Sequence, residues 1–152
     1  MFPIEWTKIR RAKNLKHGEL AYLQDLDMSL VIVGTINEIT VAVMLGADVS
    51  KCTTRNVEDL SGAAFSIDAI RFEGDVKSLE RLEIMDDRYE ALVVSGSSLL
   101  LVARPPSNAG YVTIEIAELE EQNPSSIAFA YRAWRIVKDD NERVVELYRK
   151  GR

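Results

Sequence analysis

The chain has 152 residues, enough for one domain with a substantial buried core. It is 47% apolar and 28% charged, as globular proteins are, and no apolar run approaches the roughly 18–20 residues that span a bilayer. One cysteine, Cys52, excludes an internal disulfide framework and a cysteine metal cluster. Since the N-terminus shows no basic segment followed by an apolar one, we expect a cytoplasmic protein with a single domain over 1–152.

Charge is distributed unevenly around the net value of −5. Residues 1–16 hold five Lys/Arg and one Glu, and residues 132–152 hold seven Lys/Arg and four Asp/Glu. Residues 17–131 hold seven Lys/Arg and nineteen Asp/Glu, so basic ends bracket an acidic body. Such a body steers basic partners and disfavours nucleic acid. The alternative is that the charges only solvate the surface and that the basic ends lie near the acidic middle.

The first elements in chain order are a helix, a strand and a hairpin. Residues 3–14 combine basic residues with apolar ones at helical spacing, which predicts a short helix packed on a sheet. Residues 19–23 predict a strand. Two β-branched apolar runs on either side of 34–38 predict a hairpin over 29–45. Residues 46–61, rich in Asp, Ser, Thr and Asn, predict a loop with at most one helical turn.

The next segment, 63–73, is a predicted strand whose apolar alternation changes phase. Phe65 and Ile67 fall on odd positions, whereas Ile70 and Phe72 fall on even ones. Because side chains of a strand alternate with a period of two, this change predicts a bulge near 68–70. Asp68 lies at the phase change and is our candidate for a polar group that faces an internal cavity.

The second half of the chain repeats the β pattern after one predicted helix over 75–85, which Asp75 would cap. Residues 82–84 also alternate as a strand does. Hairpins are predicted over 90–104 with a turn at 96–98, and over 128–149 with a turn at 139–142. A strand over 111–117 and an acidic loop over 118–126 lie between them. In all, about eight strands and one or two short helices predict an α+β protein, mainly antiparallel β, as a bent sheet or partly open barrel.

Motifs that carry chemistry are missing from the sequence. It has no dinucleotide-binding or phosphate-binding glycine loop, no zinc-protease helix motif and no hydrolase serine motif. We therefore expect no cofactor and no metal, and an enzyme is disfavoured. His17 is more typical of a helix end than of a general base. Lys51 and Arg55 would activate the Cys52 thiol, but a lone cysteine is more often a small buried residue.

These observations favour a non-catalytic binding protein that presents an acidic surface to a basic protein partner. Bacterial immunity proteins and adaptors share this profile of size and charge. The candidate contact residues lie in two acidic loops: Asp86, Asp87, Glu118, Glu120 and Glu121. The alternative hypothesis is a small-ligand-binding β-barrel, enzymatic or not, with Asp68 facing its internal cavity. A third is a homo-oligomer in which Tyr111, Trp134 and Tyr148 form the interface.

Overall fold

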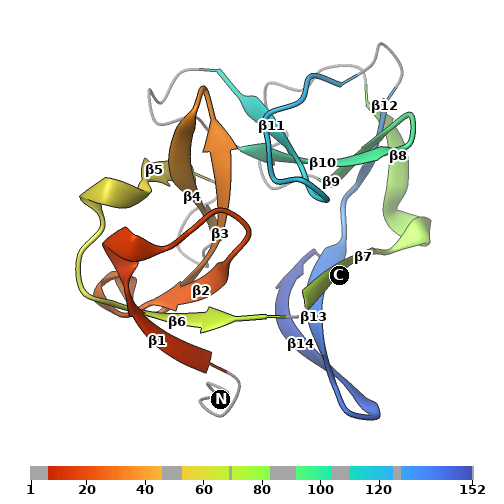
Figure 1. Cartoon of the computed structure of the whole chain (residues 1–152). Helices are drawn as coiled ribbons and strands as arrows, with labels where there is room; N and C mark the ends of the chain where they lie inside the picture. The colour runs from red at the N-terminus through yellow and green to blue at the C-terminus, as the bar shows by residue number, and fades with distance from the viewer. Residues whose placement is uncertain are drawn as a thin grey trace.

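The computed structural model describes residues 7–45, 53–68, 70–82, 92–103, 110–124 and 128–151. These residues form fourteen strands and four 3-10 helices of three residues each, and they contain no longer helix (Figure 1). All strand pairs between named strands are antiparallel. The predicted mainly antiparallel β class is therefore confirmed. The strands form three sheets that do not close into a barrel, and they outnumber the eight that we expected.

Sheet I has the strand order β1-β6-β2-β3-β4-β5 and lies on the left of Figure 1. Its strands are β1 Thr7–Arg11, β2 Leu20–Leu23, β3 Ser29–Ile36, β4 Ile39–Leu45, β5 Thr53–Asn56 and β6 Ala63–Ile67. Three 3-10 helices connect them: η2 Ala12–Asn14, η3 Gln24–Leu26 and η4 Val57–Asp59.

Sheets II and III lie at the upper right and lower right of Figure 1. Sheet II has the order β11-β10-β9-β12-β8, with β8 Leu79–Leu82, β9 Leu92–Ser95, β10 Ser98–Ala103, β11 Val112–Glu115 and β12 Ala128–Tyr131. Sheet III has the order β14-β13-β7, with β7 Ile70–Gly74, β13 Trp134–Asp140 and β14 Arg143–Lys150. The helix η5, Val76–Ser78, joins β7 to β8.

The three predicted hairpins are present as β3–β4, β9–β10 and β13–β14. Their turns are shorter than expected. Asn37 and Glu38 form the first turn, and both have positive φ, at 49° and 66°. Two left-handed residues give a turn whose twist matches the strands that it connects. This explains why Ile36 pairs directly with Ile39.

Both predicted helices are wrong in the part that the structure describes. Residues 7–11 of the predicted 3–14 helix form β1, which pairs with β6, and only Ala12–Asn14 is helical. In 75–85, Asp75 does cap a turn, since its carboxylate accepts the Lys77 N–H at 3.0 Å. That turn is the short η5, after which β8 pairs with β12. In both places, pairing with a distant strand outweighs a weak local preference for helix.

The phase change after Ile67 is a change of sheet rather than a bulge within one ladder. Ile67 pairs with Leu20 in sheet I, whereas Ile70 pairs with Lys138 in sheet III. The predicted strand over 128–138 also divides, because β12 belongs to sheet II and β13 to sheet III. The bulge that the structure does show lies in β14, opposite the step from Ile136 to Val137.

A bent two-stranded ribbon connects sheets II and III. In it, β7 pairs with β13 and β8 pairs with β12, both antiparallel. The two segments, β7–β8 and β12–β13, bend at the same level. Ser78 holds the bend, because its hydroxyl accepts the Ala133 N–H at 3.0 Å and lies 2.7 Å from the Asp75 carbonyl oxygen. Gly74 is needed there, since a Cβ on it would lie 2.7 Å from the Tyr131 ring.

All three sheets bury one face in a single apolar cluster. Sheet I contributes Leu20, Ile32 and Val43, sheet II contributes Leu92 and Ile114, and sheet III contributes Trp134 and Ile136, among others. Trp134 is 2% exposed and stacks at an angle between Phe72 and Tyr148, with ring centroids 5.8 Å and 5.4 Å away. A second cluster lies on the other face of sheet I beneath η2, η3 and η4.

We predict that Trp134→Ala lowers the free energy of unfolding by about 3–5 kcal/mol, because it leaves a cavity where the ribbon enters sheet III. Urea denaturation followed by circular dichroism measures this. The control is Val144→Ala on β14, where the side chain is 49% exposed and the expected loss is below about 1 kcal/mol. Equal losses for the two variants would contradict the placement of Trp134 in the core.

Candidate functional site

Glu118, Glu120 and Glu121, three of the five predicted contact residues, lie in one exposed segment after β11. We call residues 115–121 the acidic segment. It crosses from sheet II to the end of β3 in sheet I, and Leu119 at its middle is 8% exposed and belongs to the central core. The buried leucine thus turns the neighbouring carboxylates outward.

Backbone hydrogen bonds hold the acidic segment to both sheets. Thr35 N–H donates to the Leu119 carbonyl at 2.9 Å, and Glu121 N–H donates to the Thr35 carbonyl at 3.2 Å. On the side of sheet II, Gln122 N–H donates to the Thr113 carbonyl at 3.0 Å. Within the segment, Leu119 N–H donates to the Glu115 carbonyl at 2.7 Å. These bonds give a surface segment the support of a short strand.

Gly34 is required for this approach. A Cβ at position 34 would lie 2.7 Å from the Leu119 carbonyl oxygen, closer than real contacts allow. The glycine lets the backbone of the acidic segment approach β3 closely enough for the parallel bridge between Thr35 and Glu120. The sequence pattern predicts only a hairpin turn for Gly34 and does not indicate this contact.

His17 clamps the acidic segment from a second direction. Its Nε2 donates to the Glu118 carbonyl oxygen at 2.5 Å, since a carbonyl can only accept. In the neutral ring, Nδ1 then accepts the Thr35 hydroxyl, which lies 2.9 Å away. The sequence offered no signal for this role, because the contact joins residues 101 positions apart. His17 is therefore a structural tether and not a helix-end histidine.

The carboxylates of Glu118, Glu120 and Glu121 form no ion pair with any residue that the structure describes. The Glu115 carboxylate accepts the Glu118 N–H at 2.6 Å. An exposed carboxylate without a cation beside it keeps its full field toward solvent. The acidic segment therefore presents unneutralised charge on a supported backbone.

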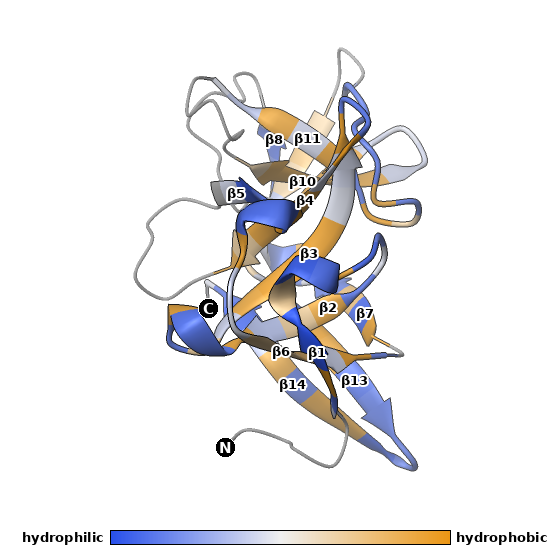
Figure 2. Cartoon of the chain, turned by 60° about the vertical axis from the view of Figure 1, so that its left-hand side comes forward, coloured by the Kyte–Doolittle hydropathy of each residue, from blue (hydrophilic) through white to orange (hydrophobic). Residues whose placement is uncertain are grey.

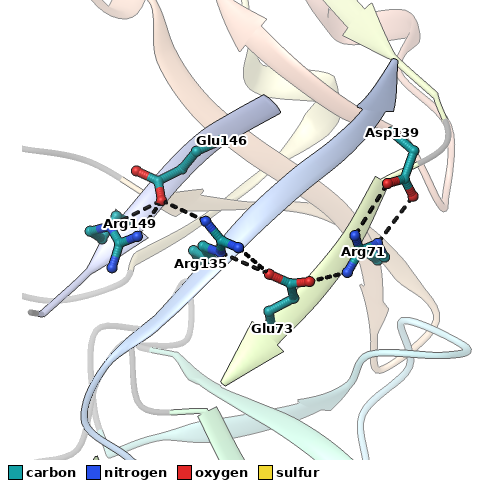
Figure 3. Close-up of polar contacts among 6 residues, drawn as sticks. All are labelled: Arg71, Glu73, Arg135, Asp139, Glu146 and Arg149. Atoms are coloured by element: carbon teal, nitrogen blue, oxygen red, sulfur yellow. Dashed lines mark hydrogen bonds and ion pairs between the residues drawn. The ribbon is translucent and has the colours of Figure 1, made fainter. Parts of the chain in front are cut away.

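Acidic residues of sheet III are in the opposite situation (Figure 3). On the face away from the core, three arginines and three carboxylates alternate across β7, β13 and β14 as a ladder: Arg71, Glu73, Arg135, Asp139, Glu146 and Arg149. Arg135 lies 2.7 Å from Glu73, and Arg71 lies 3.0 Å from Asp139. We call this set the charge ladder. Its formal charges cancel, so it contributes little net field.

The ladder arginines stabilise the charged forms of their partners. Hydrogen bonds from Arg135 and then Arg71 hold the pKa of Glu73 below its ordinary value. A hydrogen bond from Arg71 lowers the pKa of Asp139, and one from Arg149 lowers the pKa of Glu146. Arginines of the same sheet favour the ionised form of these carboxylates, so their charge is already balanced within the fold.

The other predicted residues lie elsewhere. Asp86, Asp87 and Cys52 are outside the described residues. The Asp68 side chain is 69% exposed and lies 3.4 Å from Lys8, so it faces solvent and not an internal cavity. Asp68 lies at the surface where the chain passes from sheet I to sheet III. Trp134 and Tyr148 pack in or against the core, and Tyr111 is 37% exposed.

Over the described ranges, no group of three or more His, Cys, Asp or Glu residues is arranged to hold a metal ion. No helix among the same residues is long and apolar enough to cross a membrane. Comparisons with protein-family models, curated proteins and solved structures find no match to this chain. What the structure shows is the fold, three antiparallel sheets on one core, and the acidic segment is our candidate site.

We predict that His17→Ala loosens the acidic segment. The loss of two side-chain hydrogen bonds at an exposed site costs about 0.5–1.5 kcal/mol of stability. Hydrogen exchange of the Leu119 and Glu121 amides should become faster, while exchange in β10 stays unchanged, and NMR measures both. Lys16→Ala is the neighbouring control and should leave these amides as they are. Unaltered exchange at Glu121 in His17→Ala would contradict the tether.

The charge ladder predicts a pH dependence of stability. Because the pKa of Glu73 is lower in the folded state, its contribution is present above the unfolded value of 4.5 and is lost as the pH falls further. Glu73→Gln should therefore lower the melting temperature near pH 7, and the difference from the wild type should shrink toward about pH 3. Glu142→Gln, in the β13–β14 turn, should match the wild type throughout. A difference that is constant with pH would refute the ion-pair account.

Proposed function

We propose that this protein is a non-catalytic cytoplasmic binding protein that presents the acidic segment to a basic protein partner, as immunity proteins and adaptor-like inhibitors do. The observation that carries the proposal is the contrast between two sets of carboxylates. Those of the charge ladder are neutralised by arginines of the same sheet, whereas Glu118, Glu120 and Glu121 have no described cation. A charge that contributes nothing to the fold is free to contribute to binding.

Support of the segment favours binding over mere solvation. A loop whose backbone is bonded to two sheets loses little conformational freedom when a partner binds, which improves affinity. The carboxylates would lie against Arg or Lys of the partner and cover a basic site by occlusion. Charge complementarity of this kind acts mainly on the association rate and on the choice of partner.

The alternative of a ligand-binding barrel has weaker support. The described sheets do not close, and the polar group that it relied on, Asp68, lies in solvent. The homo-oligomer hypothesis loses one of its three proposed interface residues, because Trp134 is buried in the core. An enzyme would need a convergent set of catalytic groups, and the chemistry around His17 is that of a tether.

The test is co-purification of the tagged full chain from its native host at low salt, with mass spectrometry of what is bound. Replacement of Glu118, Glu120 and Glu121 by glutamine is the test variant. Glu58→Gln, Asp59→Asn and Glu142→Gln together are the control, with the same charge change at other exposed positions. We expect a stoichiometric basic protein on the wild type and the control, and about 10–100-fold weaker binding to the test variant.

Salt gives the second readout. Binding that depends on exposed charges should weaken about tenfold or more between low salt and about 0.5 M, because screening shortens the range of the field. Capture that resists salt, or that survives in the test variant, would sink the proposal. Self-association alone, or a small molecule in native mass spectra, would favour the other two hypotheses.

A further inference from the structure

β1 is the edge strand of sheet I and carries opposite charge to the acidic segment. Among the strands that the structure describes, it pairs with β6 alone (Figure 1). Figure 2 shows β1 as hydrophilic beside the apolar strands of the sheet. Its sequence includes Lys8, Arg10 and Arg11, and between them Ile9 is 74% exposed. Edge strands normally carry features that discourage pairing with another chain, so an apolar side chain this exposed is unusual there.

The hydrogen-bond phase of β1 shows which backbone groups face outward. Ala12 N–H donates to the Gly62 carbonyl at 2.9 Å, so these two residues form a hydrogen-bonded pair. In an antiparallel ladder such pairs alternate with pairs that exchange no bonds. Even-numbered residues of β1 therefore bond to β6. The N–H and C=O groups of Ile9 and Arg11 point away from it, toward the open edge.

The pairing of β2 with its two neighbours, β3 and β6, gives the same hydrogen-bond phase independently. Val33 N–H donates to the Glu19 carbonyl at 2.8 Å, just before β2 begins. Because hydrogen-bonded residues alternate along an antiparallel ladder, the odd-numbered residues of β2 bond to β3 and its even-numbered residues bond to β6. Tyr22 is paired with Phe65, which places the odd-numbered residues of β6 on the side of β2. The even-numbered residues of β6 remain for β1, in agreement with the bond between Ala12 and Gly62.

Cations without a described partner lie beside this edge. Arg11 and Lys13 are exposed and form no ion pair with any carboxylate in the described ranges. Both line a shallow groove of about 670 Å³, whose other walls are Ile9, Arg10, Leu60, Ser61, Gly62 and Ala63. The groove therefore combines apolar side chains with positive charge that no described carboxylate neutralises, next to the outward-facing backbone groups of Ile9 and Arg11.

The edge is held in place before any partner arrives. Glu19 accepts Arg10 Nη1 at 2.6 Å and the Ser66 hydroxyl at 3.0 Å, which fixes β1 to the sheet and to the loop after η2. Its side chain is only 16% exposed, so this contact is less screened than those at the surface. Arg10 is thus occupied in the fold, whereas Arg11 and Lys13 are not.

We propose that the β1 edge binds an extended acidic segment of another protein by strand addition. Main-chain bonds to Ile9 and Arg11 would supply affinity, and carboxylates opposite Arg11 and Lys13 would supply specificity. A second copy of β1 fits poorly, because the lysine and arginines of one copy would lie against those of the other and repel them. A nucleic acid would satisfy the charges but leaves the backbone groups unpaired. This surface is separate from the acidic segment, so the proposal stands without the proposed function.

The experiment uses the ¹⁵N-labelled full chain and a blocked synthetic peptide, Glu-Val-Glu-Val-Glu-Val-Glu. We expect a dissociation constant of about 100 µM or tighter, with shifted resonances and slower hydrogen exchange at the Ile9 and Arg11 amides. The same peptide with alternate N-methyl groups along its pairing edge should fail to bind. Arg11→Glu with Lys13→Glu should weaken binding at least about tenfold, while Arg143→Glu on the β13–β14 hairpin should not.

Two proline variants test the phase of the ladder. Ile9→Pro removes a donor that faces solvent, which an edge strand tolerates, so the melting temperature should stay within about 3 °C while peptide binding is lost. Lys8→Pro removes a donor to β6 and should lower the melting temperature. If Ile9→Pro fails to fold, the phase assignment is wrong, and the N-methylated peptide still tests strand addition on the unmodified chain.

The proposal is overturned by equal binding of Lys-Val-Lys-Val-Lys-Val-Lys, by binding that survives N-methylation, or by resonance shifts that lie away from β1. Tighter binding of a single-stranded oligonucleotide would assign the edge to nucleic acid instead. A concentration-dependent dimer in sedimentation that Ile9→Pro abolishes would assign it to self-association.

Discussion

The packing of three sheets onto one apolar cluster is the constraint on which the rest of this structure depends. Each sheet contributes one apolar face to this core, because a sheet has to bury such a face against another element. Trp134 lies where the bent ribbon leaves sheet II for sheet III and fills the space between Phe72 and Tyr148. Its side chain is thus among the large ones that fill the space where the sheets meet.

The acidic segment follows from this arrangement. It joins sheets I and II because Leu119 is drawn into the shared core while Thr35 and His17 bond to the backbone on either side. The carboxylates of Glu118, Glu120 and Glu121 then have no cation beside them among the described residues. The ladder of sheet III shows the other outcome, in which strand pairing places arginines and carboxylates side by side and removes their net field. The same residue types are therefore paired with each other on one sheet and left exposed, without a described cation, beside another.

Some of this was predictable from local patterns. Hairpins at 29–45, 90–104 and 128–149 follow from alternation and turn residues, and the outward position of Glu118, Glu120 and Glu121 follows from their charge. The helices expected at 3–14 and 75–85 were wrong in their described parts, because helical spacing over so few residues is weaker than pairing with β6 or β12. The phase change at Asp68 was a real signal, but it marked a change of sheet.

The sequence by itself determined that this protein is antiparallel β, where its main hairpins turn and where its charge is concentrated, since these depend on neighbours within a few residues. Only the tertiary structure decided which strands share a sheet, which carboxylates are neutralised and which edge is left open. The contact of His17 with Glu118 spans 101 positions, and Arg71 meets Asp139 across 68. Such pairs leave no local pattern, because they form when the core brings distant strands together.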